Sequence, residues 1–66
     1  MNFKRLEGET EEQLIYRVAS QKDLIGTWQN VADILNDILG YAYSESAYRK
    51  KYQAFQKLMQ ANESKL

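Results

Sequence analysis

Residues 27–40 read TWQNVADILNDILG, and this stretch decides the fold. Its apolar residues recur at the three- and four-residue spacing of one helical face: Trp28, Val31, Ala32, Leu35, Ile38 and Leu39. Thr27 supplies the hydroxyl of an N-cap, and Gly40 supplies the left-handed residue that commonly ends a helix. The stretch therefore predicts a helix over residues 28–39 with Trp28 as its core anchor. Three polar residues of the opposite face are expected to point to solvent: Asp33, Asn36 and Asp37.

A shorter helix is predicted before this stretch, over about residues 11–21. Thr10 followed by Gln13 fits a capping box, and the two acids between them favour the positive end of a helix. The apolar residues that follow repeat at helical spacing: Leu14, Ile15, Val18 and Ala19. The connection over residues 22–26 is expected to be a tight turn whose two apolar side chains face inward: Leu24 and Ile25.

A longer helix is predicted at the other end, over about residues 45–61. Ser44 is a good N-cap, and Glu45 adds a favourable charge in the first turn. Four apolar residues of this helix recur on one face: Tyr48, Tyr52, Phe55 and Met59. The link over residues 40–43 is short enough to make the two helices pack as neighbours. Its two tyrosines either pack on the core or place a hydroxyl on a phosphate: Tyr41 and Tyr43.

These patterns predict an all-α fold, a small three-helix bundle without a sheet, in one trihelical domain over residues 1–66. One core is expected to hold the large side chains of the second and third helices: Trp28, Val31, Leu35, Tyr52 and Phe55. The initial methionine and the abrupt finish suggest the N-terminal part of a longer protein.

The composition excludes several classes of function. The chain has 66 residues, 44% of them hydrophobic, which suffices for one small core and leaves no room for a second. It contains neither cysteine nor histidine, so Cys/His zinc sites, disulfides, thiol nucleophiles and imidazole acid–base chemistry are all excluded. Its acids are scattered and lack the ligand rhythm of a calcium site. We expect no enzyme, no metal and no cofactor. We also expect a cytoplasmic chain without a membrane span, because no apolar run approaches about 18 residues.

The net charge of zero hides a segregation of charge along the chain. Residues 6–40 carry seven acids against two bases, or −5, whereas residues 41–61 carry four bases against one acid, or +3. On the helix over residues 45–61, the face opposite the apolar stripe consists of long hydrogen-bonding side chains without an acid: Ser46, Arg49, Lys50, Gln53, Gln56 and Lys57. A solvated amphipathic face is the simpler interpretation of any single one of these residues, and their clustering favours a binding surface.

Side chains of these types read duplex DNA. Arginine reaches guanine O6 and N7, glutamine pairs with adenine N6 and N7, and an α-helix fits the major groove. The residues predicted to read base edges are Arg49, Gln53 and Gln56. The residues predicted to contact the DNA backbone are Thr27, Gln29, Ser46, Lys50 and Lys57.

The predicted helices also resemble a known family. Residues 27–35, TWQNVADIL, resemble the first helix of a Myb-like or homeodomain-like helix-turn-helix, and residues 44–52, SESAYRKKY, resemble the matching recognition helix. More narrowly, residues 24–29, LIGTWQ, and residues 45–55, ESAYRKKYQAF, resemble the amino-terminal domain of a group of phage and prophage proteins from Gram-positive bacteria. The resemblance implies a helix-turn-helix arrangement and a DNA-binding module in the cytoplasm of a bacterial host.

One departure from the helix-turn-helix pattern and one rival function remain. At least four residues separate the second and third helices, where the tightest units have about three. The rival is a protein-interaction module, because a core this small gains stability from association. Such a module would form a homodimer, or bind another protein, through the C-terminal continuation or through apolar surface left uncovered at Leu58, Met59 and Leu66.

Overall fold

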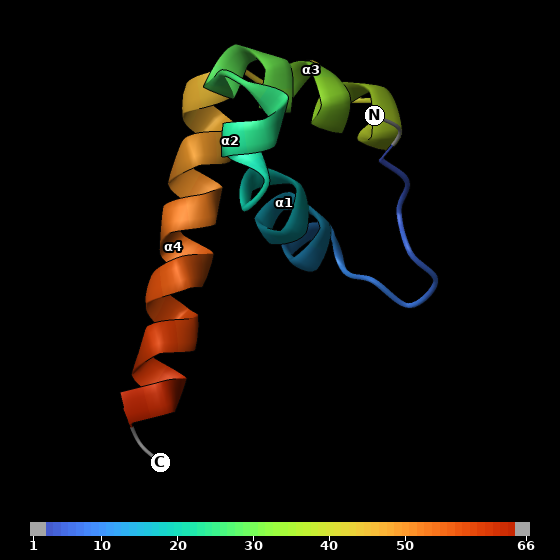
Figure 1. The fold of residues 1–66 in the computed structure, drawn as a ribbon. Helices are drawn as coiled ribbons and strands as arrows, with labels where there is room; N and C mark the ends of the chain where they lie inside the picture. Colours follow the sequence, from blue (N-terminus) through green and yellow to red (C-terminus); the bar gives the residue numbers. More distant parts are fainter. Residues whose placement is uncertain (1–2, 65–66) are drawn as a thin grey trace.

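A computed structural model describes residues 3–64, with side chains over residues 3–61. The described residues form four helices and no strand, so the all-helical prediction is confirmed (Figure 1). The helices are α1 (Glu11–Ala19), α2 (Lys22–Ile25), α3 (Trp28–Leu39) and α4 (Glu45–Ser64). The predicted count of three was therefore one too low, because the expected turn between α1 and α3 is itself a helical turn.

The predicted caps are present at three of the helices. Thr10 Oγ1 accepts from the Gln13 N–H at 3.1 Å, and Gln13 Oε1 accepts from the Thr10 N–H at 2.9 Å, which completes the capping box of α1. Thr27 Oγ1 accepts from the Asn30 N–H at 3.2 Å at the start of α3. Gly40 ends α3 with φ of 72° and ψ of 28°, a left-handed conformation that glycine adopts without strain.

Three predicted boundaries or orientations were wrong. Helix α1 ends at Ala19 because the Ser20 hydroxyl donates to the Tyr16 carbonyl at 2.6 Å and closes the last turn. Helix α4 continues to Ser64, three residues past the predicted end. Leu24 was expected to face inward and is 68% exposed, since the single turn of α2 directs only Ile25 against the core.

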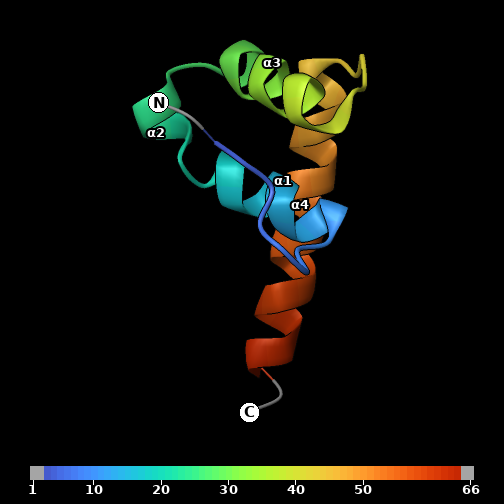
Figure 2. The same cartoon turned by 90° about the vertical axis from the view of Figure 1, so that its right-hand side faces the viewer.

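The core lies where α1, α3 and α4 meet. It consists of eight buried residues: Leu14, Ile15, Val18, Ala19, Val31, Ala32, Leu35 and Tyr48. Helix α4 stands across both α1 and α3, and in both views its C-terminal half projects beyond them (Figure 1, Figure 2). The predicted core members Val31 and Leu35 are confirmed as fully buried, whereas the other three expected members are only half-buried: Trp28, Tyr52 and Phe55.

A row of aromatic rings seals the edge of this core. The ring centroids of Trp28 and Tyr52 lie 5.6 Å apart, those of Tyr52 and Tyr16 lie 5.4 Å apart, and those of Tyr16 and Phe55 lie 5.3 Å apart. The half-buried rings therefore pack on one another and not inside the aliphatic centre. The sequence analysis left Tyr16 without a role, although it joins α1 to α4 in this row.

Asn36 holds the link between α3 and α4, contrary to the expectation that it points to solvent. Its Oδ1 accepts from the Tyr43 N–H at 3.0 Å and from the Tyr48 hydroxyl at 2.5 Å, and its Nδ2 donates to the Tyr43 carbonyl at 2.9 Å. Tyr41 and Tyr43 stay 40% and 43% exposed, with the Tyr43 ring resting on Tyr48 at 5.7 Å. The amide of Asn36 thus joins the helices that the link connects.

Candidate nucleic-acid interface

The burial of Tyr48 determines which face of α4 reaches solvent. Tyr48 is fully buried, so the side of α4 turned away from the core carries the polar residues. Five of the six predicted polar side chains are exposed: Ser46, Arg49, Lys50, Gln53 and Lys57. Gln56 is half-buried. The structure therefore presents most of the predicted surface as one outward face.

The positive charges of this face have no acidic partner among the side chains of residues 3–61. In that part of the chain, one ion pair joins Arg17 to Glu9, with 2.8 Å between Arg17 Nε and Glu9 Oε2. The hydrogen bond from Arg17 lowers the pKa of the Glu9 carboxyl, and the same bond raises the pKa of Arg17. Arg17 is thus already used within the fold, while the cations of α4 remain available to an anionic ligand.

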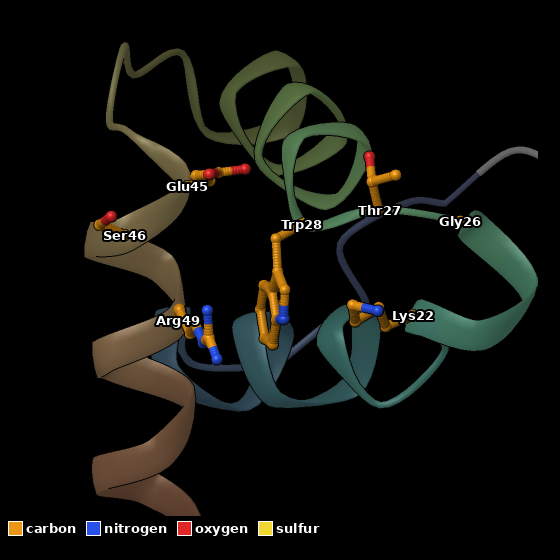
Figure 3. A pocket seen from close by; sticks show the side chains of 7 residues that line it. All are labelled: Lys22, Gly26, Thr27, Trp28, Glu45, Ser46 and Arg49. Carbon is orange, nitrogen blue, oxygen red and sulfur yellow. The ribbon is translucent and has the colours of Figure 1, made fainter.

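A surface cleft adjoins the first turns of α4. It measures about 280 Å³ and is lined by residues of α2, α3 and α4 with their connections: Lys22, Gly26, Thr27, Trp28, Glu45, Ser46 and Arg49. Figure 3 shows Arg49 and Lys22 on opposite sides of the Trp28 ring, with the Arg49 guanidinium directed toward the indole. Two cations from distant parts of the chain therefore flank one aromatic side chain in the same cleft.

The cleft brings together three of the eight predicted site residues: Thr27, Ser46 and Arg49. Gln29 is not among its lining residues, and its Nε2 donates to Asp33 Oδ1 at 3.0 Å on the exposed face of α3. The other four predicted residues lie further along α4, outside the cleft: Lys50, Gln53, Gln56 and Lys57. Lys22 was not predicted, since nothing local to residues 22–26 indicates that this segment lines a cleft together with residues of α4.

A second, apolar groove lies on another flank of α4, against α1. It measures about 240 Å³ and is lined by Glu12, Lys51, Ala54, Phe55 and Leu58. Leu58 is 60% exposed and Met59 is 37% exposed, while Leu66 lies outside the described residues.

None of the helices in the described part of the chain combines the length and the apolar character that a membrane span requires.

Comparison with known proteins relates the chain to a family. No curated protein and no solved structure is similar to this chain at a significant level. The family model described as the YonJ N-terminal domain matches residues 1–66, which is the whole of the sequence given. The expected resemblance to a phage-type amino-terminal domain is confirmed at that level. The chain therefore belongs to the YonJ N-terminal domain family.

Proposed function

We propose that this domain binds duplex DNA by placing α4 in the major groove. The observation that carries the proposal is the outward face of α4, where exposed cations and amides have no acidic partner among the described residues. A helix of ordinary diameter fits the major groove, and side chains of these types bond to base edges and phosphates.

The arrangement of the helices supports this function. Helices α1 and α3 both contact the side of α4 opposite its outward face, as the supporting helices of a helix-turn-helix domain do (Figure 1). The three hydrogen bonds of Asn36 hold the link over residues 40–43, so the orientation of α4 relative to α3 is defined by side-chain contacts as well as by chain length. A recognition helix held in this way meets DNA with little loss of conformational freedom.

The positions along α4 suggest different roles. Gln53 lies on the outward face and is proposed to bond to a base edge. Lys50 and Lys57 are proposed to hold phosphates on either side, with Ser46 contacting the backbone nearby. The half-buried Gln56 is proposed to read bases with less freedom than Gln53, since part of its side chain already packs on the domain.

Selection from random duplex DNA at two salt concentrations tests the proposal, using the domain alone and as an artificially dimerised fusion. We expect Gln53→Ala to cost about 1 to 3 kcal/mol on the preferred site and to relax the choice of base. We expect Lys57→Ala to weaken binding to all duplexes alike. It should also lower by about one the salt slope, which is the dependence of the logarithm of the binding constant on the logarithm of the salt concentration. Lys51→Ala is the matched control, because Lys51 lines the apolar groove and not the outward face. Absence of any salt-dependent duplex binding by the dimerised domain would refute the proposal.

A protein-interaction module is the second candidate, and the apolar groove favours it. Leu58 remains 60% exposed beside Phe55 and Ala54, so part of the apolar surface that this rival function requires is uncovered. In that case, substitution of the cations of the outward face leaves association unchanged, whereas substitution of Leu58 abolishes it.

A further inference from the structure

The cleft beside Trp28 has the features of an anion site. Lys22 comes from α2 and Arg49 from α4, and both side chains border the ring of Trp28 (Figure 3). Among the described residues, no acceptor bonds to the Lys22 ammonium, to the Arg49 guanidinium or to the Trp28 indole N–H. The two positive charges at this cleft repel each other. A bound anion offsets this repulsion because it attracts both of them.

We propose that this cleft binds one backbone phosphate of the duplex at the exposed edge of the Trp28 ring, where Lys22 and Arg49 flank the phosphate from the two sides and the indole N–H is a third donor; this inference rests on the proposed function. Arg49 then holds the DNA backbone and does not read a base. Lys22, which the sequence did not indicate, becomes part of the interface.

The size and position of the cleft favour a phosphodiester over a free small molecule. At about 280 Å³ the cleft is slightly below the range of about 300 to 1,000 Å³ in which pockets enclose a whole ligand, and most of its lining residues are exposed. Ser46 and Arg49 belong both to the cleft and to the outward face of α4, so the two surfaces are continuous. A strand that borders a groove occupied by α4 therefore passes over the cleft.

Glu45 is the one acid that lines the cleft, and it allows a test by gain of affinity. Its carboxylate repels a phosphate, so Glu45→Gln should tighten duplex binding. Trp28→Phe keeps an aromatic ring and removes the indole donor, so it should weaken all duplexes alike and leave the salt slope unchanged.

The decisive experiment measures binding of the preferred duplex and of an unrelated duplex over a range of salt concentrations. Lys22→Ala and Arg49→Ala should each weaken both duplexes alike and lower the salt slope by about one, while Lys51→Ala leaves the slope unchanged. Arg49→Lys should keep both the salt slope and the base preference, because lysine also binds phosphate, as a point charge. Because the chain has one tryptophan, Trp28, its fluorescence should change when the wild-type domain binds either duplex.

Different results overturn the cleft and the proposed function. If Gln53→Ala and Lys57→Ala weaken binding while Lys22→Ala behaves like Lys51→Ala, the cleft inference is wrong and the proposed function stands. If Arg49→Ala relaxes the choice at one base position without changing the slope, Arg49 reads a base and the inference is again wrong. If the domain binds neither duplex, the cleft inference and the proposed function are both wrong. Circular dichroism of each variant establishes that the helices are intact.

Discussion

Tyr48 shows how one side chain sets the orientation of a helix. It is the largest of the fully buried side chains, and its hydroxyl meets Asn36 Oδ1 at 2.5 Å, so both its apolar ring and its polar end are accommodated. Burial raises the pKa of this hydroxyl, with nearby Tyr43 and Glu11 adding to the effect. The side of α4 that carries Tyr48 is therefore committed to the core, and the cationic side is committed to solvent.

Tyr48→Phe isolates the contribution of the hydroxyl. We expect a loss of about 0.5 to 1.5 kcal/mol in the free energy of unfolding, because Asn36 Oδ1 keeps its bond from the Tyr43 N–H. Since the pKa of Tyr48 is raised in the folded state, its contribution is present below the unfolded value of about 10 and is lost as the pH rises further. Urea unfolding at neutral and alkaline pH measures both effects, and an equal alkaline loss in Tyr48→Phe would contradict the second.

Leu35→Ala tests the core itself. Leu35 is fully buried in α3, so its truncation should lower the free energy of unfolding by about 2 to 5 kcal/mol. A loss of this size unfolds a large fraction of a domain with little stability to spare. Leu24→Ala is the matched control, because Leu24 is 68% exposed and should change stability little. Equal losses from the two substitutions in urea unfolding would refute the assigned core.

Glu9 makes the stability of the fold depend on pH in the acid range. Its side chain is 8% exposed, and the hydrogen bond from Arg17 lowers the pKa of its carboxyl. A lowered folded-state pKa stabilises the fold above the unfolded value of about 4.3, and this contribution is lost as the pH falls through the folded-state pKa. Thermal unfolding between pH 7 and pH 3 should show that fall in the wild type. The Glu9→Gln variant should be less stable than the wild type at pH 7, and its stability should fall less as the pH is lowered. A pH dependence of stability equal to that of the wild type would contradict this role of Glu9.

At the scale of elements, α1 depends on its cap and its packing more than on its length. Its nine residues are too few for a stable isolated helix in water. The capping box at Thr10 and the buried face that contacts α4 supply what propensity lacks. Tyr16 of α1 also belongs to the row of aromatic rings, so fraying of α1 would loosen its contact with α4.

Removal of the cap should therefore lower the free energy of unfolding of the whole domain. We expect Thr10→Ala to cost about 1 kcal/mol in the free energy of unfolding, because the Gln13 N–H loses its acceptor. Thr10→Ser keeps the hydroxyl and should restore most of the stability. Urea unfolding followed by circular dichroism measures both variants, and a loss in the serine variant equal to that in the alanine variant would show that the capping oxygen is not the cause.

At the scale of the whole molecule, α4 determines the shape. A helix of 20 residues spans about 30 Å, and the longest extent of the molecule is 36 Å. Its first half packs on α1 and α3, whereas its second half projects with Leu58 largely exposed (Figure 1). The groove beside Leu58 carries Glu12 on one wall and Lys51 on the other, so a second copy related by a two-fold axis could pair opposite charges there.

This surface is too small for tight association. We expect the 66-residue chain to be monomeric or weakly dimeric at micromolar concentration, with Leu58→Lys abolishing any dimer, since one groove of about 240 Å³ buries little apolar surface. Sedimentation velocity over a range of concentrations measures this. A dimer that persists at nanomolar concentration would contradict the expectation and favour the interaction module.

Local signals in the sequence located three of the four helices of the described residues, with both ends of α3 and the starts of α1 and α4. Capping residues, positive-φ glycine and apolar spacing are local signals, and they located α3 and the starts of α1 and α4 without knowledge of the rest of the chain. The same spacing placed Lys50, Gln53 and Lys57 on the face of α4 opposite Tyr48, because a helical period fixes which residues share a side.

Only the tertiary structure decided how these faces meet. The cleft exists because Trp28 at the start of α3 stands between α2 and the first turns of α4, so that Lys22 and Arg49 line the same cleft from its two sides. Helical periodicity predicted that Asn36 faces solvent, but in the fold its amide bonds to Tyr43 and Tyr48 and anchors the link. Periodicity specifies the side of a helix on which a residue lies, but the angle and distance between helices depend on packing among residues far apart in the chain.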